Sequence, residues 1–350
     1  MTTYALLPRA SANRVYGATS LALTQAELAF VDRMVLGAVI THQAPTELGG
    51  VEYLLVDCGD SSLDDVQVDV ISNLSSLQAL FAVEGPLLRP VTVRPRLRCD
   101  DDITTIQRYV GKTNELFTRL LVNVTLAASG DGFRRLFAGE PVRLLDPLCG
   151  RGTSLNQAVV YGLDAFGIEI DRKDVDAYGT FIVTWLKDKR VKHRVERAKL
   201  RRGRESPARR LSISYGPPAP GGQRRIDVVN DDTVNAADHV KARSMDLIVA
   251  DLPYGVQHGT RPGDGRTSPT SRHPDELLKR ALPVWRRLLR ADGAIGLAWN
   301  LRTLERPRLF ELVSDAGFVP CLREDDTSFV HRVDRAITRD LVVATKDADR

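Results

Sequence analysis

The sequence predicts an α/β protein with a Rossmann-like, mostly parallel seven-stranded sheet, a C-terminal antiparallel hairpin and a small N-terminal α+β domain. Three observations predict this fold. Short apolar strands alternate with helical stretches from Val142 onward, the first of these strands runs into a glycine-rich turn, and two further strands follow the last helix. Such alternation is typical of a parallel sheet that helices cover on both faces.

The first 102 residues are expected to form the small α+β domain, which one interpretation makes a degenerate RNA-recognition domain. Strand-like runs at residues 3–7, 51–56 and 87–93 alternate there with helical stretches near residues 24–36 and 62–80. Thr24 and Glu27 have the spacing of a capping box and are predicted to open the first helix.

Residues 103–350 are expected to form the larger domain, which begins with a connector and one helix over 103–129. The predicted strands of its sheet are residues 142–145, 165–170, 227–230, 246–250, 294–299, 318–322 and 340–345. A basic insertion spans about 186–225, where we expect the preceding helix to continue to Arg204. The turn-rich stretch between Ser212 and Gly222 is expected to be a loop.

Charge is distributed unevenly along the chain. Residues 1–100 carry 7 Lys and Arg against 11 Asp and Glu, whereas residues 186–225 carry 14 against 3. The net charge of the whole chain is only +4. A basic block on an otherwise acidic chain predicts a polyanionic partner.

Other features of the composition narrow the class of protein. No run of 18 apolar residues is present, which argues against a membrane span, and the first residues lack the pattern of a secretory signal. The four cysteines are far apart and form no CxxC pair. We therefore expect neither a metal site nor a disulfide scaffold, and a cytoplasmic location.

A glycine-rich turn, DPLCGRGTSL, follows the first strand of the larger domain. Gly150 and Gly152 allow a tight turn and close approach to a ligand, and the amides of the next helix face a carboxylate. Asp146 can accept a hydrogen bond from an ammonium group. S-adenosylmethionine carries both groups, so we predict it as the cofactor. The turn residues Pro147, Cys149 and Thr153 are included among its contacts, with Cys149 expected to act by packing.

The next two strands end in further candidate cofactor contacts. Glu169 is placed to accept both ribose hydroxyls and Ile170 to pack on adenine. Asp231 is placed to accept from the adenine amine, with Asp232 as the substitute if the register differs by one. Two alternatives stay open. A nicotinamide dinucleotide site needs GxGxxG, whose third glycine is missing here, and a purely structural turn needs no ligand.

The fourth strand runs into Asp251-Leu252-Pro253-Tyr254 at the edge where open α/β sheets bind ligands. This tetrapeptide resembles the Asp-Pro-Pro-Tyr motif of amino-methyltransferases. In that chemistry Asp251 and the Leu252 carbonyl accept hydrogen bonds from the two N–H groups of an exocyclic amine. This arrangement directs the lone pair of the amine at the methyl group. Tyr254 stacks on the base. We predict these four residues as the catalytic set.

Taken together, DPLCGRGTSL, GIEID and DLPYG resemble the RNA methylase family that includes the THUMP-associated tRNA guanosine N2-methyltransferases. The resemblance covers about residues 105–347 and implies a class I methyltransferase fold. It also implies a helix that caps the cofactor pocket, with Asn114 as a cofactor contact and Thr113 and Phe117 as weaker ones. The first 100 residues are too short and too acidic for the family's complete docking domains.

The basic insertion is the predicted RNA-binding surface. Its candidates are Lys187, Lys189, Arg190, Lys192, Arg194, Arg197, Lys199, Arg201 and Arg202. A stripe of this kind neutralises phosphates and gives salt-sensitive binding, whereas the simpler alternative is a solvated basic insertion. Two further activities stay open: methylation of adenine N6 or cytosine N4 in DNA or rRNA, and a non-catalytic RNA-binding module.

Overall fold

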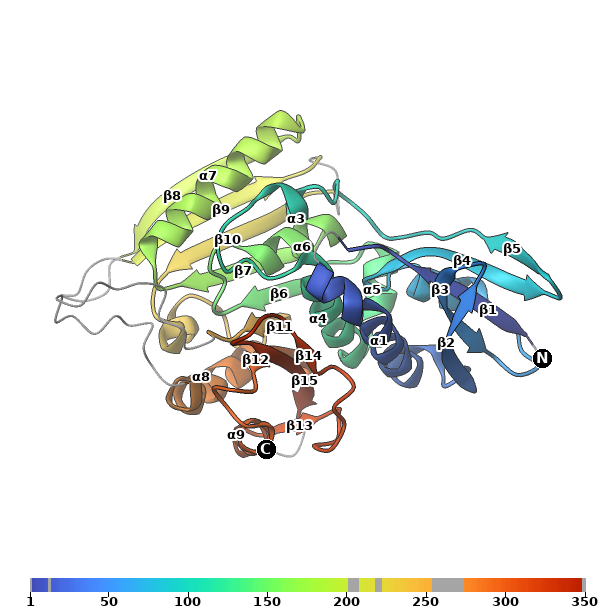
Figure 1. Cartoon of the computed structure of the whole chain (residues 1–350). Helices are drawn as coiled ribbons and strands as arrows, with labels where there is room; N and C mark the ends of the chain where they lie inside the picture. Colours follow the sequence, from blue (N-terminus) through green and yellow to red (C-terminus); the bar gives the residue numbers. More distant parts are fainter. Residues whose placement is uncertain (1, 12–13, 201–207, 218–221, 254–273, 348–350) are drawn as a thin grey trace.

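The computed structural model describes residues 2–11, 14–200, 208–217, 222–253 and 274–347, which form two β-sheets (Figure 1). One hydrophobic core runs through both sheets. No helix in these ranges combines the length and the apolar character that a bilayer span requires.

The first sheet is antiparallel, with the order β2-β3-β1-β4-β5. Its strands are β1 (Thr3–Pro8), β2 (His42–Leu48), β3 (Val51–Asp57), β4 (Leu77–Glu84) and β5 (Leu87–Val91). Its helices are α1 (Arg14–Val31), a short π-helix η1 (Asp32–Leu36) and α2 (Asp65–Ile71). Helix α1 contacts three of these strands, and it also contacts helix α4 and strand β14, which belongs to the second sheet.

The predicted capping box at the start of the first helix is wrong. Helix α1 begins ten residues before Thr24, so Thr24 and Glu27 lie in its interior. Glu27 is fully buried and accepts hydrogen bonds from Ser75 and from Asn123. Buried polar groups need such partners, and this need explains the position of Glu27 better than a helix end does.

The second sheet has the order β13-β15-β12-β11-β6-β7-β10-β9-β8, and β14 pairs with β15. Its five parallel strands are β6 (Arg143–Asp146), β7 (Asp164–Glu169), β10 (Arg224–Asn230), β11 (Met245–Asp251) and β12 (Leu289–Asn300). Numbered along the chain, they have the doubly wound order 3-2-1-4-5. Antiparallel strands follow beyond β12: β15 (Thr338–Lys346), β13 (Phe318–Pro320) and β14 (His331–Arg332).

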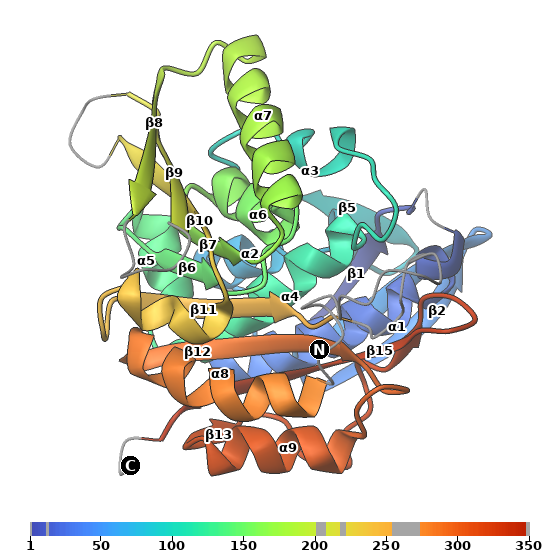
Figure 2. The same ribbon diagram turned by 90° about the vertical axis from the view of Figure 1, so that its left-hand side faces the viewer.

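This strand order confirms the predicted Rossmann-like fold, with β15 antiparallel to β12. Over the residues described, the sheet has ten strands and not the predicted seven, because β8, β9 and β14 join it as well. Helices α6 (Thr153–Tyr161) and α7 (Arg172–Asp188) lie on one face, and α8 (Pro274–Leu288) and α9 (Arg306–Asp315) on the other (Figure 2). The remaining helices are α3 (Ile103–Ile106), α4 (Glu115–Ala128), α5 (Gly132–Ala138) and the 3₁₀-helix η2 (Thr233–Asp238). Helix α4 packs on β11, β12 and β15.

The sequence predicted that the basic insertion continues the preceding helix, and this prediction is wrong. Helix α7 ends at Asp188, and the chain returns as β8 (His193–Leu200) and β9 (Ala208–Tyr215), which extend the sheet beyond β10. The predicted loop over 212–222 therefore begins only after Tyr215. The sequence RLSISY of β9 alternates polar and apolar residues, and Leu211, Ile213 and Tyr215 are buried.

Candidate active site

Four polar residues end neighbouring parallel strands at the carboxyl edge of the second sheet. Asp146 ends β6, Glu169 ends β7, Asn230 ends β10 and Asp251 ends β11. Strands β6 and β11 are hydrogen-bonded neighbours, and the strand order reverses between them. Open α/β sheets bind ligands at such a switch point. The structure therefore brings Asp146 and Asp251 together where the two predicted motifs have to meet.

The glycine-rich turn between β6 and α6 has the backbone that the sequence predicted. Gly150 and Gly152 have φ values of 49° and 80°, which favour glycine. A side chain at Gly152 would also overlap the ring of Tyr178 on α7. The backbone N–H of Gly150 donates to Oε2 of Glu169 over 2.9 Å, which ties the turn to the end of β7.

Asp146 is a buried carboxyl group beneath this turn. Its oxygens accept hydrogen bonds from the hydroxyl of Ser154 and, over 3.0 Å, from the backbone N–H of Leu148. Burial raises the pKa of Asp146 to about 7, and the nearby Asp251 and Glu169 carboxylates add to this effect. A cationic ligand beside this carboxyl group would therefore stabilise its charged form.

The end of β7 presents a carboxylate beside an apolar side chain. Glu169 accepts hydrogen bonds from the backbone N–H groups of Gly150 and Asp171, while burial raises its pKa. Ile170 follows with 38% of its surface exposed. The side chain of Asn230 donates to the carbonyls of Glu169 and Ile170, both over 2.9 Å, and fixes this strand end.

Asp231 and Asp232 already have partners within the protein. Asp231 is contacted by His239 over 2.7 Å and by the Asn235 side chain over 2.9 Å. Burial favours a higher pKa for Asp231, but the hydrogen bonds from His239 and Asn235 outweigh it and lower the pKa. Asp232 accepts from the backbone of Val234 and caps η2. Both carboxylates are thus engaged within the protein, and a contact of either one with adenine remains a prediction.

The other predicted turn residues are placed around the same bend. Pro147 and Cys149 are buried, and Cys149 lies where a side chain on Gly167 of β7 would collide with its sulfur. The Thr153 hydroxyl contacts the hydroxyl of Tyr109 over 2.8 Å. Asn114 caps α4 by accepting from the backbone N–H groups of Leu116 and Phe117, so its predicted cofactor contact is left to its amide nitrogen.

At the end of β11, Asp251 is contacted from two remote segments. Thr113 donates its hydroxyl hydrogen to Oδ2, and Nη2 of Arg339 on β15 lies 3.4 Å from the same oxygen. Leu252 is buried, and its N–H donates to the Ala298 carbonyl over 2.8 Å. Pro253 follows, and Tyr254, the fourth predicted catalytic residue, lies outside the described residues.

Several residues at this edge were missed by sequence reasoning. Tyr109 receives the guanidinium of Arg151 over its ring at 5.1 Å, and Arg151 also pairs with Asp174 over 2.8 Å. Arg339 had no signal in the sequence, because only the pairing of β15 with β12 brings it to Asp251. In the described part of the chain, no group of three or more His, Cys, Asp and Glu side chains is arranged to hold a metal ion.

The predicted RNA-binding residues do not share one surface. Lys187 lies in the last turn of α7, and Lys189 pairs with Asp100 over 2.6 Å. Arg190 and Lys192 lie between α7 and β8. Strand alternation places Arg197 and Lys199 on one face of β8 and Arg194 on the other. Arg201 and Arg202 lie outside the described residues.

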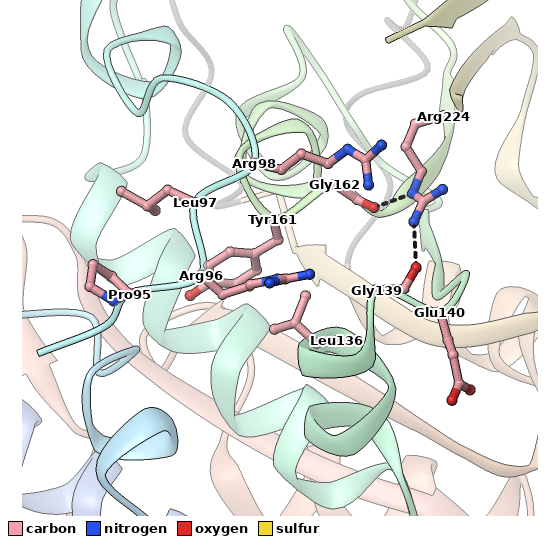
Figure 3. Close-up of a pocket in the computed structure, with 10 residues that line it drawn as sticks. All are labelled: Pro95, Arg96, Leu97, Arg98, Leu136, Gly139, Glu140, Tyr161, Gly162 and Arg224. Atoms are coloured by element: carbon pink, nitrogen blue, oxygen red, sulfur yellow. Dashed lines mark hydrogen bonds between the residues drawn. The ribbon is translucent and has the colours of Figure 1, made fainter. Parts of the chain in front are cut away.

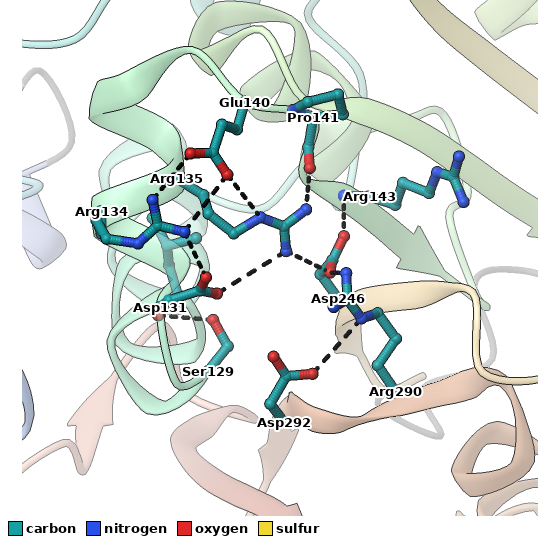
Figure 4. A network of polar contacts seen from close by, with 11 residues as sticks. Ser129, Asp131, Arg134, Arg135, Glu140, Pro141, Arg143, Asp246, Arg290 and Asp292 are labelled. Carbon is teal, nitrogen blue, oxygen red and sulfur yellow. Dashed lines mark hydrogen bonds and ion pairs between the residues drawn. The ribbon is translucent and has the colours of Figure 1, made fainter.

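Two arginine-rich pockets lie at the opposite, amino edge of the sheet. One, of about 320 Å³, is lined by Arg96, Arg98 and Arg224 (Figure 3). Arg224 donates there to the carbonyls of Gly139 and Gly162, which end α5 and α6. The other, of about 290 Å³, surrounds Asp246, which accepts from Arg135 and Arg290 (Figure 4). Both pockets are therefore separate from the site around Asp146 and Asp251.

Comparison with known proteins adds little beyond the fold. No family model and no curated protein matches the sequence. A TehB-like SAM-dependent methyltransferase from Corynebacterium glutamicum has a TM-score of 0.32 and 17% identity, covering 61% of this chain and 86% of its own.

Two other solved structures give similar values. An rRNA methylase from Streptococcus thermophilus has a TM-score of 0.33 and 12% identity, over 59% of this chain and 87% of its own. A geranyl diphosphate C-methyltransferase from Streptomyces coelicolor, solved with S-adenosyl-L-homocysteine, has a TM-score of 0.34 and 12% identity, over 59% and 71%. Function therefore has to follow from the side chains of the site.

Proposed function

We propose that the chain is an S-adenosylmethionine-dependent N-methyltransferase that acts on an exocyclic base amine, with guanosine N2 of tRNA as the favoured substrate. One observation carries the proposal. The buried Asp146 and the second acid, Asp251, end adjacent strands on the two sides of the switch point, and the glycine turn follows Asp146. This arrangement suits a nucleotide-like cofactor next to a polar acceptor group.

The residues of the turn fit the parts of the cofactor. Asp146 would accept from its ammonium group, and the amides at the start of α6 would face its carboxylate. The Glu169 oxygens already accept backbone N–H groups, and each has lone-pair capacity left for a ribose hydroxyl. The exposed side chain of Ile170 offers an apolar contact for adenine. The bound cofactor supplies an electrophilic methyl group on a sulfonium.

Asp251 would orient the amine. An exocyclic amine is a weak nucleophile because its lone pair is delocalised into the ring. When Asp251 and the Leu252 carbonyl accept hydrogen bonds from its two N–H groups, the lone pair points out of the ring plane. The nitrogen–carbon bond then forms as the sulfur–carbon bond breaks, and the electron pair stays on sulfur. The nitrogen loses its extra proton to Asp251 or to water.

The choice of RNA rests on the charge of the β8–β9 hairpin and on the resemblance of the three motifs to tRNA guanosine N2-methyltransferases. Phosphate contacts position a nucleic acid but do not select its sequence. The hairpin therefore supports a nucleic-acid substrate, while the motifs favour guanosine N2 over adenine N6 or cytosine N4.

Transfer of a tritiated methyl group tests the proposal. The protein is incubated with labelled S-adenosylmethionine and with total tRNA, rRNA or DNA, and the labelled nucleoside is identified. We expect N2-methylguanosine in tRNA. Label in N6-methyladenosine or N4-methylcytidine would move the substrate to another amine. Absence of label in every pool, despite cofactor binding, would favour a non-catalytic RNA-binding module.

Substitution of the acid tests the assigned role. Asp251→Ala should lower kcat at least roughly 100-fold, the usual scale for a lost proton acceptor. The affinity for S-adenosyl-L-homocysteine, measured by calorimetry, should stay unchanged. Asp292→Ala, at the amino edge of the sheet, is the matched control and should behave like the wild type. Full activity of Asp251→Ala would contradict the role.

A further inference from the structure

The Asp251 carboxylate is contacted by two side chains that are far apart in the sequence. Thr113 precedes α4, and its hydroxyl donates to Oδ2. Arg339 belongs to β15, and its Nη2 lies 3.4 Å from the same Oδ2. Two contacts on one oxygen, from different directions, fix the orientation of the carboxylate plane.

Arg339 is itself built into the core. Only 3% of its surface is exposed, which is unusual for an arginine. Its guanidinium lies over the ring of Phe117 on α4, 4.7 Å from the ring centre, and Phe117 is fully buried. A cation over an aromatic face is stabilised, which favours this position of the guanidinium. The position of Arg339 therefore follows from packing and does not depend on Asp251 alone.

The histidine beside Arg339 adds no positive charge to this cluster near neutral pH. His331 pairs with Arg339 across strands β14 and β15, and its ring centre lies 4.9 Å from that of Phe117. Burial lowers the pKa of His331 to about 4, so this neighbour is neutral near pH 7. Tyr16 of α1 also contacts the His331 ring, in an edge-to-face arrangement with the ring centres 6.2 Å apart. The positive charge that this cluster directs at Asp251 therefore comes from the Arg339 guanidinium.

We propose that Thr113 and Arg339 are positioning residues that hold Asp251 through Oδ2 and so orient its carboxylate for the hydrogen bond from the substrate amine. This inference rests on the proposed function. Methyl transfer needs the amine within a narrow range of angles, and small errors of orientation are costly in rate. Thr113 and Arg339 act through Asp251 and therefore influence the methyl-transfer step, while the cofactor turn around Asp146 is left as it is.

Paired substitutions at Thr113 test the hydroxyl. Thr113→Val removes the hydroxyl with little change of shape, and Thr113→Ser keeps it. We expect kcat to fall roughly 10- to 100-fold in the valine variant, the scale of a lost hydrogen bond to a charged group. The serine variant should stay within about twofold of the wild type on the same scale. Because the Thr113 hydroxyl donates to Asp251, we no longer expect its predicted weak contact with the cofactor. KM for RNA and the affinity for S-adenosyl-L-homocysteine should therefore not change in either variant.

Arg339 is tested in the same way. Arg339→Met keeps the chain length without the charge, and Arg339→Lys keeps the charge without the flat guanidinium. We expect kcat to fall most in the methionine variant, with partial recovery in the lysine variant. Thermal unfolding shows whether each variant is folded, and the Thr113 pair keeps the inference testable if the Arg339 variants are not.

A double-mutant cycle separates positioning from general damage. Thr113→Val in an Asp251→Ala background should cause no further loss of the residual rate, because the group through which Thr113 acts is gone. A full additional loss there, or a wild-type kcat in Thr113→Val, would overturn the inference and leave the proposed function intact. A wild-type protein that methylates no nucleic acid would overturn both.

Discussion

Asp146 shows how strongly a single buried carboxyl group links cofactor binding to stability. Its pKa of about 7 means that near neutral pH the folded protein holds a proton that the unfolded chain, with a value near 3.8, has lost. The free energy of unfolding should therefore fall as pH rises from about 4 to about 7. Across this interval the contribution is on the order of 4 kcal/mol.

Asp146→Asn should remove this part of the pH dependence. An asparagine keeps an acceptor for Leu148 and a polar group for Ser154, so the fold should be retained. We expect the variant to match or exceed the stability of the unliganded wild type at pH 7.5 and to bind S-adenosyl-L-homocysteine much more weakly. Urea unfolding between pH 4.5 and 7.5 measures the difference. Identical pH profiles for the two proteins would contradict the prediction.

Individual site residues could be predicted where the chain itself fixes their position. Asp146, Glu169 and Asp251 each follow an apolar strand, and parallel neighbours bring their ends to one edge. Arg339 could not be predicted, because its contact with Asp251 depends on long-range strand pairing. The partners of Asp231 likewise depend on how η2 turns back towards β10.

At the scale of elements, the β8–β9 hairpin is where the prediction failed. The density of Lys and Arg after Trp185 favoured a continued helix, since both are good helix formers. The alternation in β9 was the better signal, because Leu211, Ile213 and Tyr215 have a buried face to fill. Cationic residues on β8 also suit the exposed edge of a sheet, where charge discourages pairing with other strands.

The two faces of the hairpin should contribute differently to RNA binding. Arg197, Lys199 and Arg209 share one face through the strand register, while Arg194 and Arg210 share the other and pair with Glu196 and Asp227. Changing the first three to glutamine should reduce the slope of log K against log salt by about 2 to 3. Changing Arg194 and Arg210 should reduce it by less than about 1.

Fluorescence anisotropy with tRNA between roughly 50 and 250 mM salt gives both slopes, as salts in this range screen such contacts strongly. Equal slopes for the first variant and the wild type would show that these cations protect the sheet edge and do not dock RNA.

At the scale of the whole molecule, a buried polar network joins the two sheets. Asn123 of α4 donates to Glu27 of α1 and to the carbonyl of Asn73, each over 2.7 Å, and accepts from the Tyr161 hydroxyl over 2.6 Å. Burial raises the pKa of Glu27, while the donors from Ser75 and Asn123 act against this. Loss of one member of a buried network leaves the groups it contacted unsatisfied, so its members should depend on one another.

Asn123→Ala should therefore destabilise the protein by roughly 2–4 kcal/mol, because three buried groups lose a partner at once. Thr180→Ala on the exposed side of α7 is the control, with an expected change within about 0.5 kcal/mol. Chemical denaturation followed by circular dichroism measures both values. A loss for Asn123→Ala no larger than that of the control would show that the shared apolar core alone holds the sheets together.

The place of β15 in the sheet has a consequence for biosynthesis. This strand comes after every other strand of the sheet in the chain, yet it lies between β12 and β13 and carries Arg339. A nascent chain that has emerged only as far as Ala336 has already made both acidic strand ends but lacks the guanidinium that steadies one of them. Catalytic competence would thus be gained late in translation, and premature stop codons before this strand should yield inactive products even where the cofactor turn is complete.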